Sequence, residues 1–192
     1  MSHWHEWFGV WTTTRAAGLT AYLLLFVSTA SGILTSMRFV RPERRAALLT
    51  LHQFTGWIGF LFGLLHGCVL LFDRYVGYQL YELAIPFAAH DHRFWNGIGT
   101  VACYLSFVLV LSSDLVKRIG RRAWRAIHFL AFPAYALALM HGFALGTDTR
   151  IPWVQGLYAA TGLAILVLCG FRFSARAVPD KKADVRLPSS RS

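Results

Sequence analysis

The chain has 192 residues, 56% of them hydrophobic, and 19 Lys and Arg residues against 9 Asp and Glu residues give it a net charge of +10. The hydrophobic share exceeds that of ordinary globular domains. The basic residues stand between long apolar runs and form no single basic face, so we exclude a nucleic-acid-binding protein. The three cysteines form no CxxC or CxxCH pattern, and so indicate neither a zinc site nor a covalently attached haem.

Five apolar segments are long enough to cross a bilayer, which takes about 20 mainly apolar residues per helix. We therefore predict an all-α integral membrane protein, a five-helix transmembrane bundle that fills residues 16–171. The residues before the first span lack the basic start of a signal peptide, so we expect a retained helix. The predicted spans are Ala16–Thr35, Leu48–Phe72, Phe94–Leu115, Trp124–Leu145 and Trp153–Phe171.

The positive charges alternate along the chain in step with these spans. Fifteen of the 19 Lys and Arg residues follow the first, third and fifth spans. Since such residues concentrate in cytoplasmic loops, we expect residues 1–15 outside, and residues 172–192 as a disordered tail in the cytoplasm. The pattern predicts a multi-pass protein of a bacterial inner membrane. The outer loop Asp73–Arg93 is too short to span and is expected to lie at the interface.

Four histidines fall within the predicted spans. His52 and His66 lie on the second, and His128 and His141 lie on the fourth. These two helices run parallel, so His52 and His128 share an inner depth, and the other two an outer depth about 20 Å away. Paired imidazoles at two depths predict two stacked haem b groups, each with bis-histidine ligation, held between the second and fourth helices.

Two alternatives to haem ligation stay open. A membrane histidine often serves packing or hydrogen bonding, and chains of histidines also relay protons in pumps. A relay would also want carboxylates within the spans, whereas Asp73 and Asp114 fall at helix ends. One observation fits poorly: 13 residues leave His141 about 140° around the helix from His128. Pro133 lies between the two histidines and should kink or re-twist the helix.

Further candidate residues accompany the histidines. Gly56, Gly59 and Gly63 follow His52 on its own helix face, where they could admit a flat cofactor or, alternatively, close helix packing. Arg15, at the outer end of the first helix, suits an anionic haem propionate, although an interfacial anchor is the alternative.

At these residues the chain resembles the ferric reductase-like transmembrane domain family. The matching segments are TRAAGLTAYLLL, LHQFTGWIGFLFGLLHG and RRAWRAIHFLAFPAYALALMHGFALGTDT. The resemblance implies an inner haem on His52 and His128, an outer haem on His66 and His141, and an arginine near the outer haem. Many members have six helices, and the oxidase-type members carry a cytoplasmic flavin and nicotinamide domain, whereas neither feature is expected here.

We therefore expect the membrane electron-transfer subunit of an oxidoreductase. A separate flavoprotein or quinol would be the donor; ferric iron, a flavin on a partner or a partner reductase would be the extracytoplasmic acceptor. The alternatives are a quinol-oxidising cytochrome b subunit of a larger complex, and a haem-handling or ion-translocating protein without net electron transfer. Two HxH pairs, which could bind a metal, remain unassigned: His3 with His5, and His90 with His92.

Overall fold

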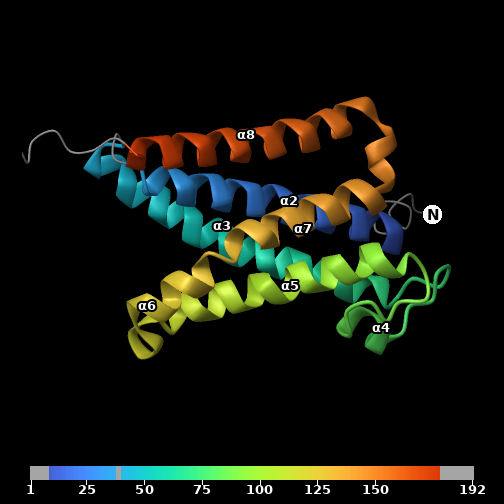
Figure 1. Cartoon of the computed structure of the whole chain (residues 1–192). Helices are drawn as coiled ribbons and strands as arrows, with labels where there is room; N and C mark the ends of the chain where they lie inside the picture. Colours follow the sequence, from blue (N-terminus) through green and yellow to red (C-terminus); the bar gives the residue numbers. More distant parts are fainter. Residues whose placement is uncertain (1–8, 38–39, 178–192) are drawn as a thin grey trace, which may run out of the picture.

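The computed structural model describes residues 9–37 and 40–177, and every regular element in those ranges is helical (Figure 1). The predicted extracytoplasmic segment lies mostly outside the described residues, and so does most of the predicted tail. The elements are α2 (Val10–Thr35), α3 (Pro42–Leu70), α4 (Leu80–Ala84), α5 (Arg93–Asp114), α6 (Val116–His128), α7 (Ala131–Leu145), the 3-10 helix η1 (Thr147–Arg150) and α8 (Pro152–Ala177).

Four of these helices, α2, α3, α5 and α8, are each long and apolar enough to cross a membrane. Helices α6 and α7 meet the same test only as a pair, bent by 45°. The predicted all-helical, multi-pass architecture is thus confirmed. Helix α3 begins at Pro42, six residues before the predicted span, because proline at the first position of a helix gives up no intrahelical hydrogen bond.

The bend separates α6 from α7 directly after His128. Phe129 and Leu130 form a turn between the two helices, and Pro133 lies in the first turn of α7. Proline has no N–H to donate to the carbonyl four residues earlier, which is that of Phe129. The predicted fourth span is therefore broken in two, and the angle expected between His128 and His141 on one straight helix no longer applies.

Successive long helices run in opposite directions, so α3 and α7 run the same way (Figure 1). Helix α2 packs along α3 and also contacts α7 and α8, while α5 packs against α7. Helix α2 is therefore the central element of the bundle. A short segment around α4 covers the end of the bundle at which α5 begins (Figure 1).

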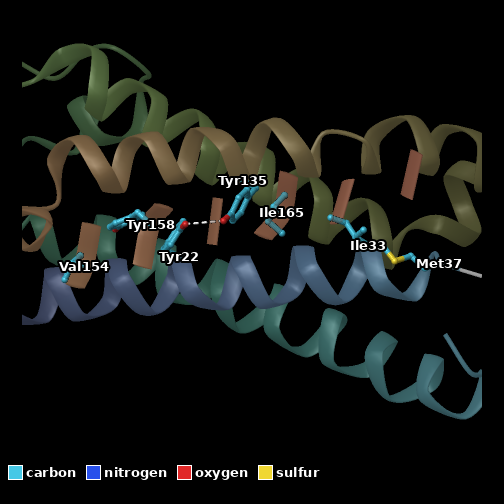
Figure 2. Packing of buried hydrophobic residues seen from close by; sticks show 7 residues of the cluster. All are labelled: Tyr22, Ile33, Met37, Tyr135, Val154, Tyr158 and Ile165. Carbon is cyan, nitrogen blue, oxygen red and sulfur yellow. Dashed lines mark hydrogen bonds between the residues drawn. The ribbon is translucent and has the colours of Figure 1, made fainter. Parts of the chain in front are cut away.

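A buried polar cluster joins α2, α7 and α8 within the apolar core (Figure 2). The Tyr22 hydroxyl lies 2.5 Å from Oγ1 of Thr161 and 3.2 Å from the hydroxyl of Tyr135. The Tyr22 ring also packs against Tyr158, with centroids 4.6 Å apart. Buried hydroxyls need partners, and these satisfy one another, so the cluster fixes the relative register of the three helices.

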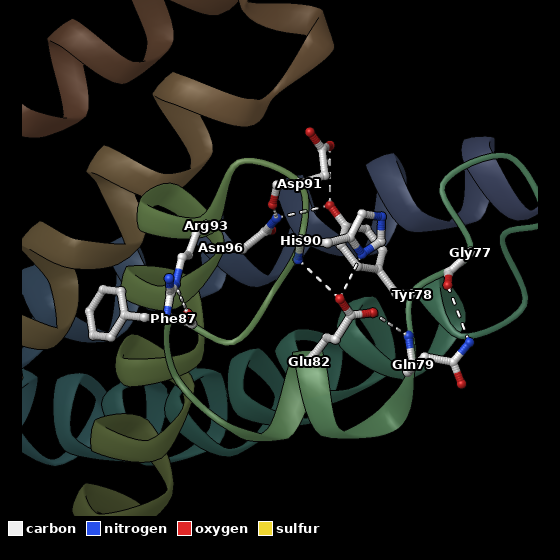
Figure 3. Close-up of polar contacts among 9 residues, drawn as sticks. All are labelled: Gly77, Tyr78, Gln79, Glu82, Phe87, His90, Asp91, Arg93 and Asn96. Atoms are coloured by element: carbon white, nitrogen blue, oxygen red, sulfur yellow. Dashed lines mark hydrogen bonds and ion pairs between the residues drawn. The ribbon is translucent and has the colours of Figure 1, made fainter.

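The loop before α5 is anchored by Glu82 of α4 (Figure 3). This side chain accepts hydrogen bonds from the backbone N–H groups of Gln79 and His90, and lies 2.6 Å from the His90 ring. The Gln79 bond is half of a capping box that starts α4. Glu82 is 4% exposed. The predicted interfacial loop is therefore a compact cap.

Candidate functional site

The four histidines of the spans form two pairs across the gap between α3 and the α6–α7 helices. The ring centroids of His52 and His128 are 5.7 Å apart, and the ring planes make an angle of 83°. The centroids of His66 and His141 are 6.1 Å apart, at 80°. The structure thus brings together the two pairs that were expected from depth along the helices. The bend after His128 allows both rings of the broken span to face α3.

Three of the four rings are oriented by a hydrogen bond from Nδ1 to a helix carbonyl. Nδ1 of His66 lies 2.9 Å from the Thr14 oxygen, and Nδ1 of His141 lies 2.8 Å from the Trp95 oxygen. Nδ1 of His52 lies 2.8 Å from the carbonyl oxygen of Ser28. Such a bond fixes the proton on Nδ1 and leaves Nε2 with a lone pair for a metal ion.

Each of these carbonyls is followed four residues later by a glycine. We call each carbonyl together with its glycine a cradle, and the three cradles are Thr14–Gly18, Ser28–Gly32 and Trp95–Gly99. A Cβ atom would lie 2.9 Å from Nδ1 of His66 at Gly18, 3.0 Å from Nδ1 of His52 at Gly32, and 2.5 Å from Nδ1 of His141 at Gly99. At Gly18 and Gly99 a larger residue would collide with the ring, and at Gly32 it would press tightly against it, so the close approach of the three rings depends on glycine.

The Ser28 cradle holds His52 by more than one contact. The Ser28 hydroxyl lies 3.0 Å from Nδ1 of His52 and also donates to the backbone carbonyl of His52 at 2.9 Å. Ser28 is 5% exposed. This polar contact inside the bundle fixes both the backbone and the ring of His52 relative to α2.

His128 is held differently from the other three histidines. Its Nδ1 atom is buried and has no hydrogen-bond partner among the described residues. The ring instead stacks on Trp124, one turn earlier on α6, with centroids 4.8 Å apart and planes 26° apart. One histidine of the four therefore lacks a cradle.

The glycines that share the histidine face of α3 lie against α2. A Cβ at Gly56 would be 3.1 Å from Oγ of Ser28, and one at Gly59 would be 3.1 Å from Cβ of Leu24. A Cβ at Gly63 would have its nearest neighbour on α2 as well, at 4.0 Å. These contacts favour close packing of α3 on α2, the alternative to clearance for a flat cofactor.

Arg15 lies beside the Thr14 cradle and is bonded to Asp148 of η1. The guanidinium reaches the carboxylate through Nε, at 2.9 Å, and through one Nη. The two side chains are 40% and 25% exposed. Because guanidinium carries five N–H donors, the second Nη keeps its donors for another anion. The ion pair ties the start of α2 to the connection between α7 and α8.

The HxH residues show no metal cluster in the described ranges. His90 contacts Glu82, and His92 precedes α5 with a left-handed backbone at φ 41°, while His3 and His5 lie outside the described residues. Among residues 9–37 and 40–177, no group of three or more His, Cys, Asp or Glu side chains could hold a metal ion. Each histidine pair offers only two protein ligands, so it is not such a group of three.

The cradle glycines are the site residues that the sequence prediction missed. Gly18 and Gly32 are 14 residues apart, which is the separation of His52 and His66. Matched spacing on two adjacent helices was therefore a signal available in the sequence. The partner of each glycine depends on how the helices pack, and spacing along a single helix does not provide it.

The family described as ferric reductase like transmembrane component matches residues 14–139. The match includes His52, His66 and His128, and it ends two residues before His141. No curated protein and no solved structure showed significant similarity to the chain. Since the match covers well over half of the sequence, the chain belongs to the ferric reductase-like transmembrane family.

Proposed function

We propose that the chain is a membrane cytochrome that carries electrons across the bilayer through two haem b groups. The inner site would use His52 and His128, and the outer site His66 and His141. The observation that carries the proposal is the separation of the paired rings, 5.7 and 6.1 Å between centroids. A metal ion bound at about 2 Å from each of two imidazoles puts their ring centres about 6 Å apart.

The surroundings of the rings support the same assignment. Histidines that bind metals usually donate their other ring nitrogen to a carbonyl or carboxylate, as His52, His66 and His141 do. Packing histidines would have no need of glycines that clear their rings, as Gly18 and Gly99 do. A haem in each pair would supply a one-electron iron couple, and two histidine ligands favour electron transfer over binding of small ligands.

The protein's own residues would set the path. The two depths are about 20 Å apart along α3, and the helices that carry the four histidines are apolar enough to cross a membrane, α6 and α7 as a pair. The proposed direction runs from a cytoplasmic flavoprotein or a quinol to ferric iron, a flavin or a partner reductase outside. Arg15 is proposed to share its free donors with a propionate of the outer haem while it keeps its bond to Asp148.

The proposal is tested by haem stoichiometry in the purified protein. A pyridine haemochrome assay should give two haems per chain for the native sequence, and one for each of His52→Ala and His66→Ala. His92→Ala, in the loop before α5, is the matched control and should retain two. A well-folded native sample with one haem or none would refute the two-haem site.

Electron throughput is tested separately, in vesicles with ferricyanide trapped inside and dithionite added outside. The native protein should oxidise dithionite faster than protein-free vesicles do, and His66→Ala should fall to the protein-free rate. Two bound haems without any transfer would favour the alternative of a haem-handling or ion-translocating protein. Transfer from a quinol alone, and only within a larger complex, would favour a quinol-oxidising subunit.

A further inference from the structure

The cradles recur with a regular spacing that predicts where a fourth cradle should lie. On α2, the outer cradle at Thr14 and Gly18 and the inner cradle at Ser28 and Gly32 are 14 residues apart. On α5, the Trp95–Gly99 cradle serves His141. The same step of 14 residues along α5 arrives at Leu109 and Ser113, near the end of the helix.

At this fourth position the cradle is absent. Ser113 stands where the other three cradles have glycine, and its hydroxyl donates to the Leu109 carbonyl at 2.9 Å. The neighbouring Ser112 hydroxyl donates to the same oxygen at 3.0 Å. A carbonyl oxygen has two lone pairs, and two side-chain hydroxyls already donate to this one. The oxygen that would hold His128 is therefore already taken.

A different set of contacts positions His128. The indole N–H of Trp124 donates to Oγ of Ser113 at 3.3 Å, and the indole ring stacks on the His128 imidazole at 4.8 Å. Ser113 thus reaches His128 through Trp124. Trp124 thus links the fourth position predicted by spacing to the fourth histidine.

We infer that the two haem sites are electronically unequal and that the site of His52 and His128 has the higher reduction potential. This inference rests on the proposed function. A bond from Nδ1 to a carbonyl makes Nε2 a stronger donor to iron, which stabilises the ferric state and lowers the potential. The outer pair has two such bonds, while the inner pair has one. Ser113 and Trp124 are positioning residues for His128.

The two haem sites should therefore be reduced in a fixed order. An electron that enters the protein resides mainly at the inner site and passes to the outer site when an acceptor withdraws charge there. The inner site thereby stores the first electron. The outer site, held by two cradles, is the stronger reductant toward that acceptor.

The inference is tested by optical redox titration of the purified two-haem protein. Two components are expected, and His66→Ala, which removes the outer haem, should leave the component of higher potential. If His66→Ala leaves the lower component, or if the two components coincide, the inference is overturned while the two-haem function stands. Failure to bind haem would overturn both.

A pair of serine variants tests whether the hydrogen-bond pattern causes the difference. Ser113→Gly places glycine at the fourth position and removes one of the two hydroxyls that donate to the Leu109 carbonyl, so the inner component should shift to lower potential. Ser106→Gly, on the same helix, is the matched control, because its hydroxyl bonds only to the carbonyl of Ala102. It should shift neither component. An unchanged or raised inner component in Ser113→Gly would refute the role of Ser113.

Trp124 provides a second test that does not depend on potentials. In Trp124→Leu, His128 loses its stacking partner and should leave the reduced iron more readily. The position it vacates should then bind carbon monoxide. Trp124→Phe retains an aromatic ring and should restore the native resistance to carbon monoxide. Trp153→Leu, at a tryptophan of α8 that is 65% exposed, is the control. Equal carbon monoxide binding by Trp124→Leu and the native protein would refute positioning by Trp124.

Discussion

Nδ1 of His141 lies 2.8 Å from the carbonyl oxygen of Trp95, and Gly99 makes that approach possible. A Cβ at residue 99 would stand 2.5 Å from the same nitrogen. This is the tightest of the three cradles. The outer pair therefore depends on a residue of α5, a helix that contributes no histidine of its own.

Gly99→Ala is expected to abolish or weaken haem binding at the outer site alone. Overpacking a closely fitted site costs typically about 1–3 kcal/mol, which corresponds to about 5- to 150-fold in affinity. The haemochrome assay should fall from two haems toward one per chain. The helical circular dichroism signal should be unchanged.

Gly156→Ala on α8 is the matched control, because a Cβ there would meet nothing within 4 Å. It should retain both haems. If Gly99→Ala also retains both, with an unshifted spectrum, the cradle is not required for ligation by His141.

The near-perpendicular planes of the paired rings predict a particular paramagnetic signal. The planes make angles of 83° for His52 with His128 and 80° for His66 with His141. Perpendicular imidazoles interact with different iron d orbitals and leave them nearly equal in energy. Both ferric sites should therefore give highly anisotropic low-spin electron paramagnetic resonance signals. The ordinary rhombic signal typical of parallel imidazoles, seen for both sites, would contradict this geometry.

Much of the fold followed from the length of the apolar segments and the alternation of the basic loops, because a bilayer sets the length of any helix that crosses it. The span predicted at Phe94–Leu115 matches α5 to within one residue at each end, whereas α3 begins six residues before the span predicted at Leu48–Phe72. The break after His128 was harder to place. Pro133 indicated a kink, but the position of the turn at Phe129 and Leu130 depends on how α6 and α7 pack against their neighbours.

The sequence predicted the position of each site residue along its own helix, but not the contacts between helices. Depth along α3 and its parallel partner paired His52 with His128, because rise per residue is fixed. The cradles were not predicted, since they join residues of α2 to α3 and of α5 to α7. Which face of Gly18 or Gly99 meets a histidine depends on interhelical angles, which spacing in one segment does not determine.

The bond between Arg15 and Asp148 allows the role of Arg15 to be separated from simple anchoring. The two side chains are partly exposed, so removing the ion pair with Asp148→Asn should cost at most about 1 kcal/mol of stability. If Arg15 also binds a propionate, Arg15→Gln should lower the potential of the outer haem, since a nearby cation is lost. Asp148→Asn should raise it, because a nearby anion is lost. Shifts of the outer haem potential with the same sign and size in both variants would contradict propionate binding.

The charge pattern predicts the orientation of the bundle. Eight arginines lie either between the end of α2 and the first turn of α3 or within α6, and basic segments of this kind concentrate on the cytoplasmic side. A fluorescent protein fused after residue 192 should fluoresce, whereas alkaline phosphatase at that position should be inactive. The same phosphatase inserted after Gly77, in the loop before α4, should be active. Reversed activities would exchange the proposed donor and acceptor sides.

The contact between Glu82 and His90 should make the cap over the start of α5 sensitive to pH (Figure 3). Hydrogen bonds to Glu82 lower the pKa of its carboxyl, and the Glu82 carboxylate raises the pKa of His90. A raised histidine pKa stabilises the folded cap below the usual histidine pKa, and this contribution is lost as pH rises through the pKa of His90 in the folded state. The lowered pKa of the Glu82 carboxyl stabilises the folded cap above the usual glutamate pKa, and this stabilisation is lost in acid.

Backbone amides of Leu80–Ala84 should therefore be best protected from hydrogen exchange at mildly acidic pH, after correction for the intrinsic rate, and less protected at pH about 9. Glu82→Gln should remove this dependence, and a dependence that persists in Glu82→Gln would mean that another group controls the cap.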